Sequence, residues 1–159
     1  MPEVYCVRAE FGTYTEQFVQ GEYVAIGWMS GFNLSAIHSK DELYPLYKKS
    51  HPEDASNLVI GQQVGQIARF LIEIKGGDYV ITPAANTELL HFAVVQPDPS
   101  YFYDPNDAGC PSPHRRRVKW DTTTIKRTDF SVPLQNPLRS SLTVFYVSQK
   151  QAFWCRVSF

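Results

Sequence analysis

The sequence predicts an α+β fold, a small, twisted, mostly antiparallel β-barrel flanked by two or three helices. Three observations lead to this prediction. The 159 residues suit one domain, and a hydrophobic fraction of 43% is enough for one core. The helical segments come early and the β-prone segments late, which argues against a doubly wound sheet. Five or six antiparallel strands can close a small barrel that hides its edges.

The first half of the chain is expected to hold two strands and three helices. β-prone runs predict the strands at residues 4–9 and 23–28. A short helix is predicted over 15–19, and Ser39 with Glu42 three positions later is a capping-box pattern for a second. The third and longest helix is predicted over 57–75, where apolar residues recur every three or four positions.

The second half of the chain is predicted to be mainly β. The expected strands are residues 78–82, 89–95, 101–103, 116–120 and 142–147. We expect one domain over residues 1–147, followed by a C-terminal strand or the start of a linker over 148–159.

Composition excludes several classes of protein. The chain has no run of about 20 apolar residues that could cross a membrane, and its first ten residues lack the pattern of a signal peptide. Cys6, Cys110 and Cys155 are far apart without CxxC spacing, which argues against a zinc site and a disulfide framework. We therefore expect a cytoplasmic protein with reduced thiols, no metal and no cofactor.

The net charge of −1 conceals an asymmetry between the two parts of the chain. Residues 1–110 contain six Lys or Arg and fourteen Asp or Glu, whereas residues 111–159 contain nine and two. Such a layout favours one face that can meet a polyanion and another that cannot.

Several segments together carry a resemblance to a known family. They are YVAIGW at 23–28, GQIARF at 65–70, IKGGD at 74–78, Thr82-Pro83, HRRRVKW at 114–120 and LTVF at 142–145. The set resembles the N-terminal domains of Mrr- and McrB-like modification-dependent restriction proteins, which are similar to the EVE and YTH branches of the PUA-like superfamily. The resemblance spans residues 4–147; the tail from 148 to 159 does not match the family pattern.

This resemblance implies a nucleic-acid-binding domain built on a pseudo-barrel with flanking helices. It implies a pocket for a flipped, modified base from double-stranded DNA, or for a methylated base in RNA as in the YTH branch. It also implies a nuclease or GTPase domain downstream. We therefore predict a non-catalytic module that recognises 5-substituted cytosine or N6-methyladenine in DNA.

A reader of this kind needs an aromatic wall and polar groups that face the base edge, because flipping a base costs a few kcal/mol. The candidate base-pocket residues are Trp28, Ser30, Asn33, Gln66, Arg69, Thr82, Pro83, Tyr101 and Tyr103. Each also has a structural interpretation: aromatic side chains fill cores, Ser and Asn form turns, and Arg69 can pair with Glu73 one helical turn away.

The reader also needs cations for the flanking phosphates. The candidates are Arg115, Arg117, Lys119, Lys126 and Arg127. Strand alternation puts Arg115, Arg117 and Lys119 on one face, at intervals of about 6–7 Å that suit successive phosphates. The alternative is a solvated face paired with acidic residues.

Two other functions stay open. One is an RNA-binding PUA-like protein. The other is a small nuclease or hydrolase, which has little support because the chain lacks GxSxG, HExxH and phosphate-loop motifs. Cys6 or Cys155 with a distant histidine would be the only nucleophile–base pair to consider, and no local signature supports it.

Overall fold

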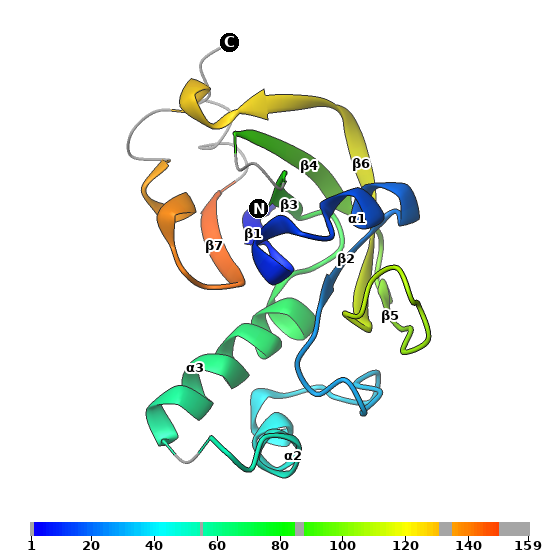
Figure 1. Cartoon of the computed structure of the whole chain (residues 1–159), viewed down its shortest axis with the longest axis vertical. Helices are drawn as coiled ribbons and strands as arrows, with labels where there is room; N and C mark the ends of the chain where they lie inside the picture. The colour runs from blue at the N-terminus through cyan, green and yellow to red at the C-terminus, as the bar shows by residue number, and fades with distance from the viewer. Residues whose placement is uncertain (1, 55, 85–87, 131–134, 150–159) are drawn as a thin grey trace.

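Seven strands form one curled sheet in the computed structural model of the chain, which describes residues 2–54, 56–84, 88–130 and 135–149 (Figure 1). The strands are β1 (Glu3–Val7), β2 (Tyr23–Ile26), β3 (Tyr79–Pro83), β4 (Leu89–Val95), β5 (Tyr101–Tyr103), β6 (His114–Lys126) and β7 (Val144–Gln149). They lie in the order β2-β6-β4-β3-β1-β7, and β5 pairs with β6. The β1–β3 pair is parallel, and the other pairings among the described residues are antiparallel. The predicted α+β fold is confirmed.

Three α-helices flank this half-barrel. They are α1 (Thr15–Gly21), α2 (Leu43–Ser50) and α3 (Asn57–Ala68). Figure 1 shows α2 and α3 together at one end of the molecule, while α1 lies beside the strands. Shorter helical turns are η1 (Ala9–Gly12), η2 (Lys40–Glu42), η3 (Arg69–Glu73), η4 (Arg127–Asp129) and η5 (Pro137–Arg139). Among the described residues, no helix has both the length and the apolar character needed to span a membrane.

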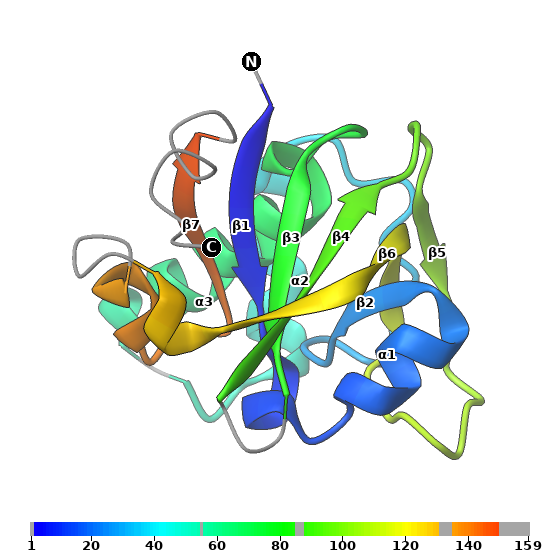
Figure 2. The same cartoon turned by 90° about the horizontal axis from the view of Figure 1, so that it is seen from above.

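The strand β6 joins the two parts of the sheet. Its first residues pair with β2 and β5, and its later residues pair with β4 (Figure 2). The pairing with β4 has a register shift between His91 and Ala93. β6 is longer than the predicted 116–120 because β-branched threonines at 122–124 extend it.

The helix predicted over 57–75 is α-helical only as far as Ala68. It continues as a π-helical turn, η3, in which the Ile74 amide donates to the Arg69 carbonyl at 2.9 Å. Ser56 is the N-cap residue of α3. The capping box of Ser39 and Glu42 at the start of η2 is confirmed.

The apolar stripe of α3 packs into the main core, as its spacing predicted. Ile60, Val64 and Ile67 are buried there with residues of β2 and β4. A second buried cluster holds Phe92 and Phe130. The predicted last strand reaches Gln149 as β7, and residues 150–159 lie outside the described part of the chain.

Candidate functional site

The loop that follows β2 forms a turn with an unusual backbone. Met29 has φ of +52°, a left-handed backbone conformation that residues other than glycine seldom adopt. The Phe32 amide donates to the Met29 carbonyl at 3.1 Å, and buried Leu34 anchors the end of the loop. Left-handed backbone at a non-glycine residue persists only where its surroundings hold it in place.

A buried aromatic stack holds this loop. The His114 ring stacks on Tyr101, with ring centroids 6.1 Å apart, and on Tyr103 at 5.5 Å. The His114 Nε2–H donates to the Met29 carbonyl at 2.9 Å, and the Tyr101 hydroxyl donates to His114 Nδ1 at 2.8 Å. The Tyr101 hydroxyl also accepts from the Leu34 amide at 3.0 Å, and the Tyr103 hydroxyl donates to the Ser30 carbonyl. The strands β5 and β6 therefore fix the loop through side chains.

A neutral histidine with its proton on Nε2 makes both of these hydrogen bonds. Burial lowers the pKa of His114 below its ordinary value, although hydrogen bonds to the backbone of Met29 and Trp28 oppose that shift. Burial also raises the pKa of Tyr101 to about 12. Both groups therefore stay uncharged near neutral pH, as a buried hydrogen-bonded chain requires.

We expect acidification to weaken folding through this histidine. The unfolded histidine takes up a proton near pH 6.5, whereas folded His114 and His91 have lowered pKa values. Their contribution is therefore complete above about pH 6.5 and declines below it, by at most about 1.4 kcal/mol per pH unit for each group. Urea unfolding between pH 7.5 and 5 measures this slope, and His114→Gln should flatten it. Equal slopes in the two proteins would contradict the assignment. The lowered pKa of Asp107 acts only at more acidic pH.

Beside the loop lies a pocket of about 250 Å³, which we call the loop pocket. It is lined by Gly27, Met29, Ser30, Gly31, Phe32, Ser50 and His51. The last two residues lie at the C-terminal end of α2, so the pocket joins this helix to the β2 loop. Ser50 Oγ and His51 Nε2 are buried without a hydrogen-bond partner among the described residues.

The structure brings five of the predicted pocket residues to this region. Ser30 lines the loop pocket, and Tyr101 and Tyr103 brace its loop from β5. The half-buried Trp28 packs against the main core. The exposed Asn33 accepts a hydrogen bond from the Ser35 amide at 3.0 Å, as its turn interpretation predicted.

The helix residues predicted for the same pocket lie elsewhere. Gln66 is buried, and its Oε1 accepts from the amides of Thr143 (2.8 Å) and Val144 (3.1 Å). Arg69 donates to Glu73 at 3.0 Å and to the Val144 carbonyl at 3.1 Å. The expectation that they border the pocket beside Trp28 is wrong, because both tie the helix to β7.

Thr82 and Pro83 are also occupied in holding the fold together. The buried Thr82 hydroxyl donates to the Val7 carbonyl at 2.8 Å. The Pro83 carbonyl accepts from the Thr15 hydroxyl at 2.7 Å. These two residues join β3 to β1 and α1, and neither lines the loop pocket.

The predicted row of three exposed cations on β6 is also incorrect at its first position. Arg115 is only 2% exposed. It donates to Asp107 at 3.0 Å and to Asp104 at 3.3 Å, and its guanidinium lies 4.2 Å from the centroid of the Tyr23 ring. Strand alternation predicted the side of β6 on which Arg115 lies, but the loop formed by residues 104–112 covers that side at Arg115.

Four predicted phosphate-contact residues keep accessible surface. Arg117, Lys119 and Lys126 are exposed, and Arg127 is partly so. The Arg117 guanidinium stacks over Phe102 at 4.2 Å from the ring centroid, which holds it in a defined orientation. Arg117 and Lys119 border a pocket of about 200 Å³, and Lys126 and Arg127 border another of about 440 Å³.

The buried thiol of Cys6 bears on the hydrolase alternative. Burial raises the pKa of Cys6 to about 12, which keeps it protonated and unreactive near neutral pH. Cys155, the other thiol considered as a nucleophile, lies outside the described residues.

Comparison with known proteins adds a family to this geometry. Residues 8–143 match the family described as Domain of unknown function (DUF8426). The chain belongs to the DUF8426 family. Among curated proteins, none matches this chain. The DUF8426 match includes the β2 loop, α2, β5 and β6, and therefore every element of the loop pocket and its aromatic brace.

Sequence reasoning missed several residues of this DUF8426 site. His51 and Ser50 lie at the end of a helix without a functional motif, and Phe32 was not among the candidate residues. Lys49 Nζ lies 5.9 Å from the centroid of the Phe32 ring, which places a cation beside the pocket. The sequence signal that could have found them is the cluster of Lys48, Lys49 and His51 where α2 ends.

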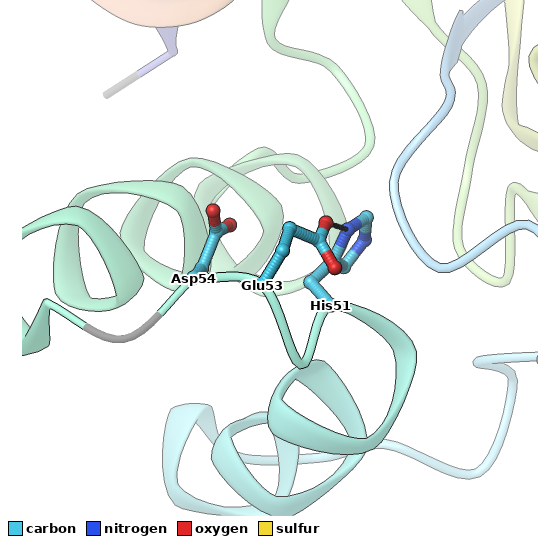
Figure 3. Close-up of side chains that lie close together, drawn as sticks. All are labelled: His51, Glu53 and Asp54. Carbon is cyan, nitrogen blue, oxygen red and sulfur yellow. Dashed lines mark hydrogen bonds and ion pairs between the residues drawn. The ribbon is translucent and has the colours of Figure 1, made fainter.

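Among the described residues, one cluster combines side chains of types that can bind a metal ion. His51, Glu53 and Asp54 lie in the turn between α2 and α3, with their ligand atoms within 4.8 Å of one another (Figure 3). His51 Nδ1 lies 3.3 Å from Glu53 Oε1. The Tyr47 hydroxyl donates to Asp54 at 2.6 Å, so this carboxylate already has a protein partner.

Proposed function

We propose that this chain is a binding module that holds one modified base, taken out of a DNA duplex, in the loop pocket. The observation that carries the proposal is the pocket itself, a small cavity between aromatic and polar side chains on a loop that a buried stack makes rigid. The resemblance of the sequence to the base-reading domains of modification-dependent restriction proteins agrees with this use.

The size of the pocket supports a ligand as small as one base. Sites for drug-sized ligands measure roughly 300–1,000 Å³, and the loop pocket measures about 250 Å³. Gly31 leaves space at its edge, since a Cβ atom there would meet no atom within 4 Å. A nucleobase is smaller than a drug and flat, so it suits this volume.

The chemistry of the lining also suits a base. The Phe32 ring offers stacking surface, which contributes about 1–3 kcal/mol per base. A buried methyl group adds about 0.8 kcal/mol. Together these gains are comparable to the few kcal/mol that flipping a base costs.

The exposed cations of β6 support contact with the backbone of the duplex. Arg117 and Lys119 are two residues apart on one face of the strand, about 7 Å from each other. That interval suits neighbouring phosphates. Because Arg115 and Arg116 are buried, these two residues are the cations of the 114–120 segment that can reach a ligand.

The proposal also covers the partner of this chain, the domain that would act with it and the cellular compartment. Double-stranded DNA is the proposed partner, and a downstream nuclease or GTPase domain would act on what this module binds. Cys6 and Cys110 are free and buried, which agrees with a reducing compartment such as the cytoplasm.

Binding to matched duplexes tests the function. Fluorescence anisotropy would compare labelled duplexes that contain a single 5-methylcytosine, a single N6-methyladenine or no modification, at about 0.15 M salt. We expect one modified duplex to bind about fourfold more tightly than the plain one, because the two differ by one buried methyl group of about 0.8 kcal/mol. Equal affinity for all three duplexes would contradict the proposal. Tighter binding to RNA of the same sequence would favour the RNA-binding alternative.

The salt dependence of binding separates phosphate contacts from base contacts. Arg117→Gln and Lys119→Gln should weaken modified and plain duplexes alike, each lowering the slope of log affinity against log salt by about 0.9. Lys75→Gln, which removes an exposed cation at the far end of η3, is the matched control and should leave the slope unchanged. The same slope in the Arg117/Lys119 double variant and the wild type would exclude this surface from binding.

A further inference from the structure

Two polar atoms of the loop pocket lack partners that the fold would normally supply. Ser50 Oγ and His51 Nε2 are buried without a hydrogen bond to any described residue, and both belong to residues that line the pocket. Leaving a buried polar atom unpaired is unfavourable, and such atoms are rare in folded proteins. Two of them, in consecutive residues that line one small pocket, point to a ligand that bonds to both.

The surroundings of His51 decide which kind of group its free nitrogen can bind. Its Nδ1 lies 3.3 Å from Glu53 Oε1 (Figure 3). A carboxylate only accepts hydrogen bonds, so the proton of the neutral ring belongs on Nδ1 and Nε2 carries a lone pair. The ring also stacks on Tyr47, with centroids 4.5 Å apart and planes 26° from parallel, which fixes its orientation.

We propose that His51 Nε2 accepts a hydrogen bond from the exocyclic amino group of the bound base, while the Ser50 hydroxyl bonds to the neighbouring ring nitrogen. This inference rests on the proposed function and names the class of base that the pocket takes. It admits bases derived from cytosine or adenine and rejects bases with a carbonyl at the same position.

A protein that recognises methylated cytosine must also distinguish it from thymine. Thymine has the same ring and the same 5-methyl group as 5-methylcytosine, and an apolar cage holds both equally. The two bases differ at position 4, where cytosine has an amino donor and thymine a carbonyl acceptor. Opposite His51 Nε2 the amino group makes a hydrogen bond, whereas the carbonyl would set two acceptors against each other.

The experiment measures this discrimination with pairs of labelled duplexes. In one pair, 5-methylcytosine or thymine stands opposite guanine, so the second strand is identical. In the other pair, N6-methyladenine or hypoxanthine stands opposite thymine. We expect the wild type to bind the amino-bearing member of its preferred pair on the order of 10- to 100-fold more tightly than the carbonyl-bearing member.

Three variants assign the effect to the pocket. His51→Phe keeps a ring that can stack on Tyr47 but removes the acceptor, and it should reduce the discrimination to about threefold or less. His51→Gln restores a side-chain acceptor and should recover most of it. Ser50→Ala should weaken binding of the amino-bearing base by about three- to tenfold. Thermal unfolding of each free protein, with Tm within about 2 °C of the wild type, shows that the fold is unchanged.

The outcomes distinguish this inference from the proposed function. If the wild type binds modified and plain duplexes equally, the proposed function fails whatever the variants do. If the wild type prefers a modified base and His51→Phe keeps the full discrimination against the carbonyl, the role of His51 is overturned. Should His51→Phe not fold, His51→Gln and Ser50→Ala decide: loss of discrimination in the glutamine variant, or unchanged binding in the alanine variant, contradicts the inference.

Discussion

Replacing Arg116 with methionine should lower the free energy of unfolding by about 3–5 kcal/mol, because it leaves several buried oxygen acceptors without their charged donor, at about 1–3 kcal/mol each. Arg116 is only 2% exposed. Its guanidinium donates to the carbonyls of Phe70 (2.6 Å) and Ile74 (2.8 Å), which the π-helical turn η3 leaves available. It also donates to Ser100 at 2.6 Å and to Asp98 at 3.0 Å.

The neighbouring arginine provides the control. Arg117→Met removes the same charge one residue along β6, but from an exposed side chain, and should change stability by no more than about 1 kcal/mol. Urea unfolding of both variants measures the difference. Equal destabilisation would mean that the hydrogen bonds of Arg116 contribute nothing beyond the general loss of charge.

Replacing His114 with phenylalanine should remove selective binding and lower the free energy of unfolding by about 2–4 kcal/mol. Phenylalanine can keep the stack between Tyr101 and Tyr103 but cannot bond to either of the two polar partners of His114. The Met29 carbonyl and the Tyr101 hydroxyl would lose hydrogen bonds in a buried setting, at about 1–3 kcal/mol each. The left-handed turn at Met29 would then lose its main support.

Tyr103→Phe is the matched variant for this prediction. It removes one hydroxyl bond to the Ser30 carbonyl at the exposed edge of the same stack, and should cost about 1 kcal/mol or less. Duplex binding and urea unfolding are measured on both variants. Retention of full preference for the modified base by His114→Phe would show that the loop pocket does not depend on this brace.

Strand alternation and helical spacing predicted most of the fold. The apolar stripe of α3 and the alternation of β6 both depend on neighbouring residues, so they can be recognised in sequence. The π-helical turn η3 depends instead on hydrogen bonds from Arg116, which lies more than forty positions away in the sequence. No local sequence pattern predicts that contact. Because that contact cannot be predicted locally, the sequence predicts an α-helix that extends to residue 75.

The candidate site was predicted less well than the fold, and its charged residues show why. Arg115, Arg116 and Arg117 are chemically identical and adjacent, yet the first two are buried and the third is exposed. The acidic partners of the two buried arginines come from two loops, one before and one after β5, whose paths are set by the whole structure. Gln66 was similarly a candidate for the base pocket but is buried against β7. The position of the β2 loop, by contrast, could be predicted from the strand that precedes it.

The place of β1 in the sheet sets the order in which the protein can be completed. This first strand lies between β3 and β7, so its two neighbours are made about 75 and 140 residues later. Contacts this distant in sequence slow folding, because long loops must close before they form. During synthesis one edge of β1 must therefore wait unpaired until β3 has been made, and the other edge until β7 has been made. The capping box, α2 and α3 depend on nearby residues and can form while it waits.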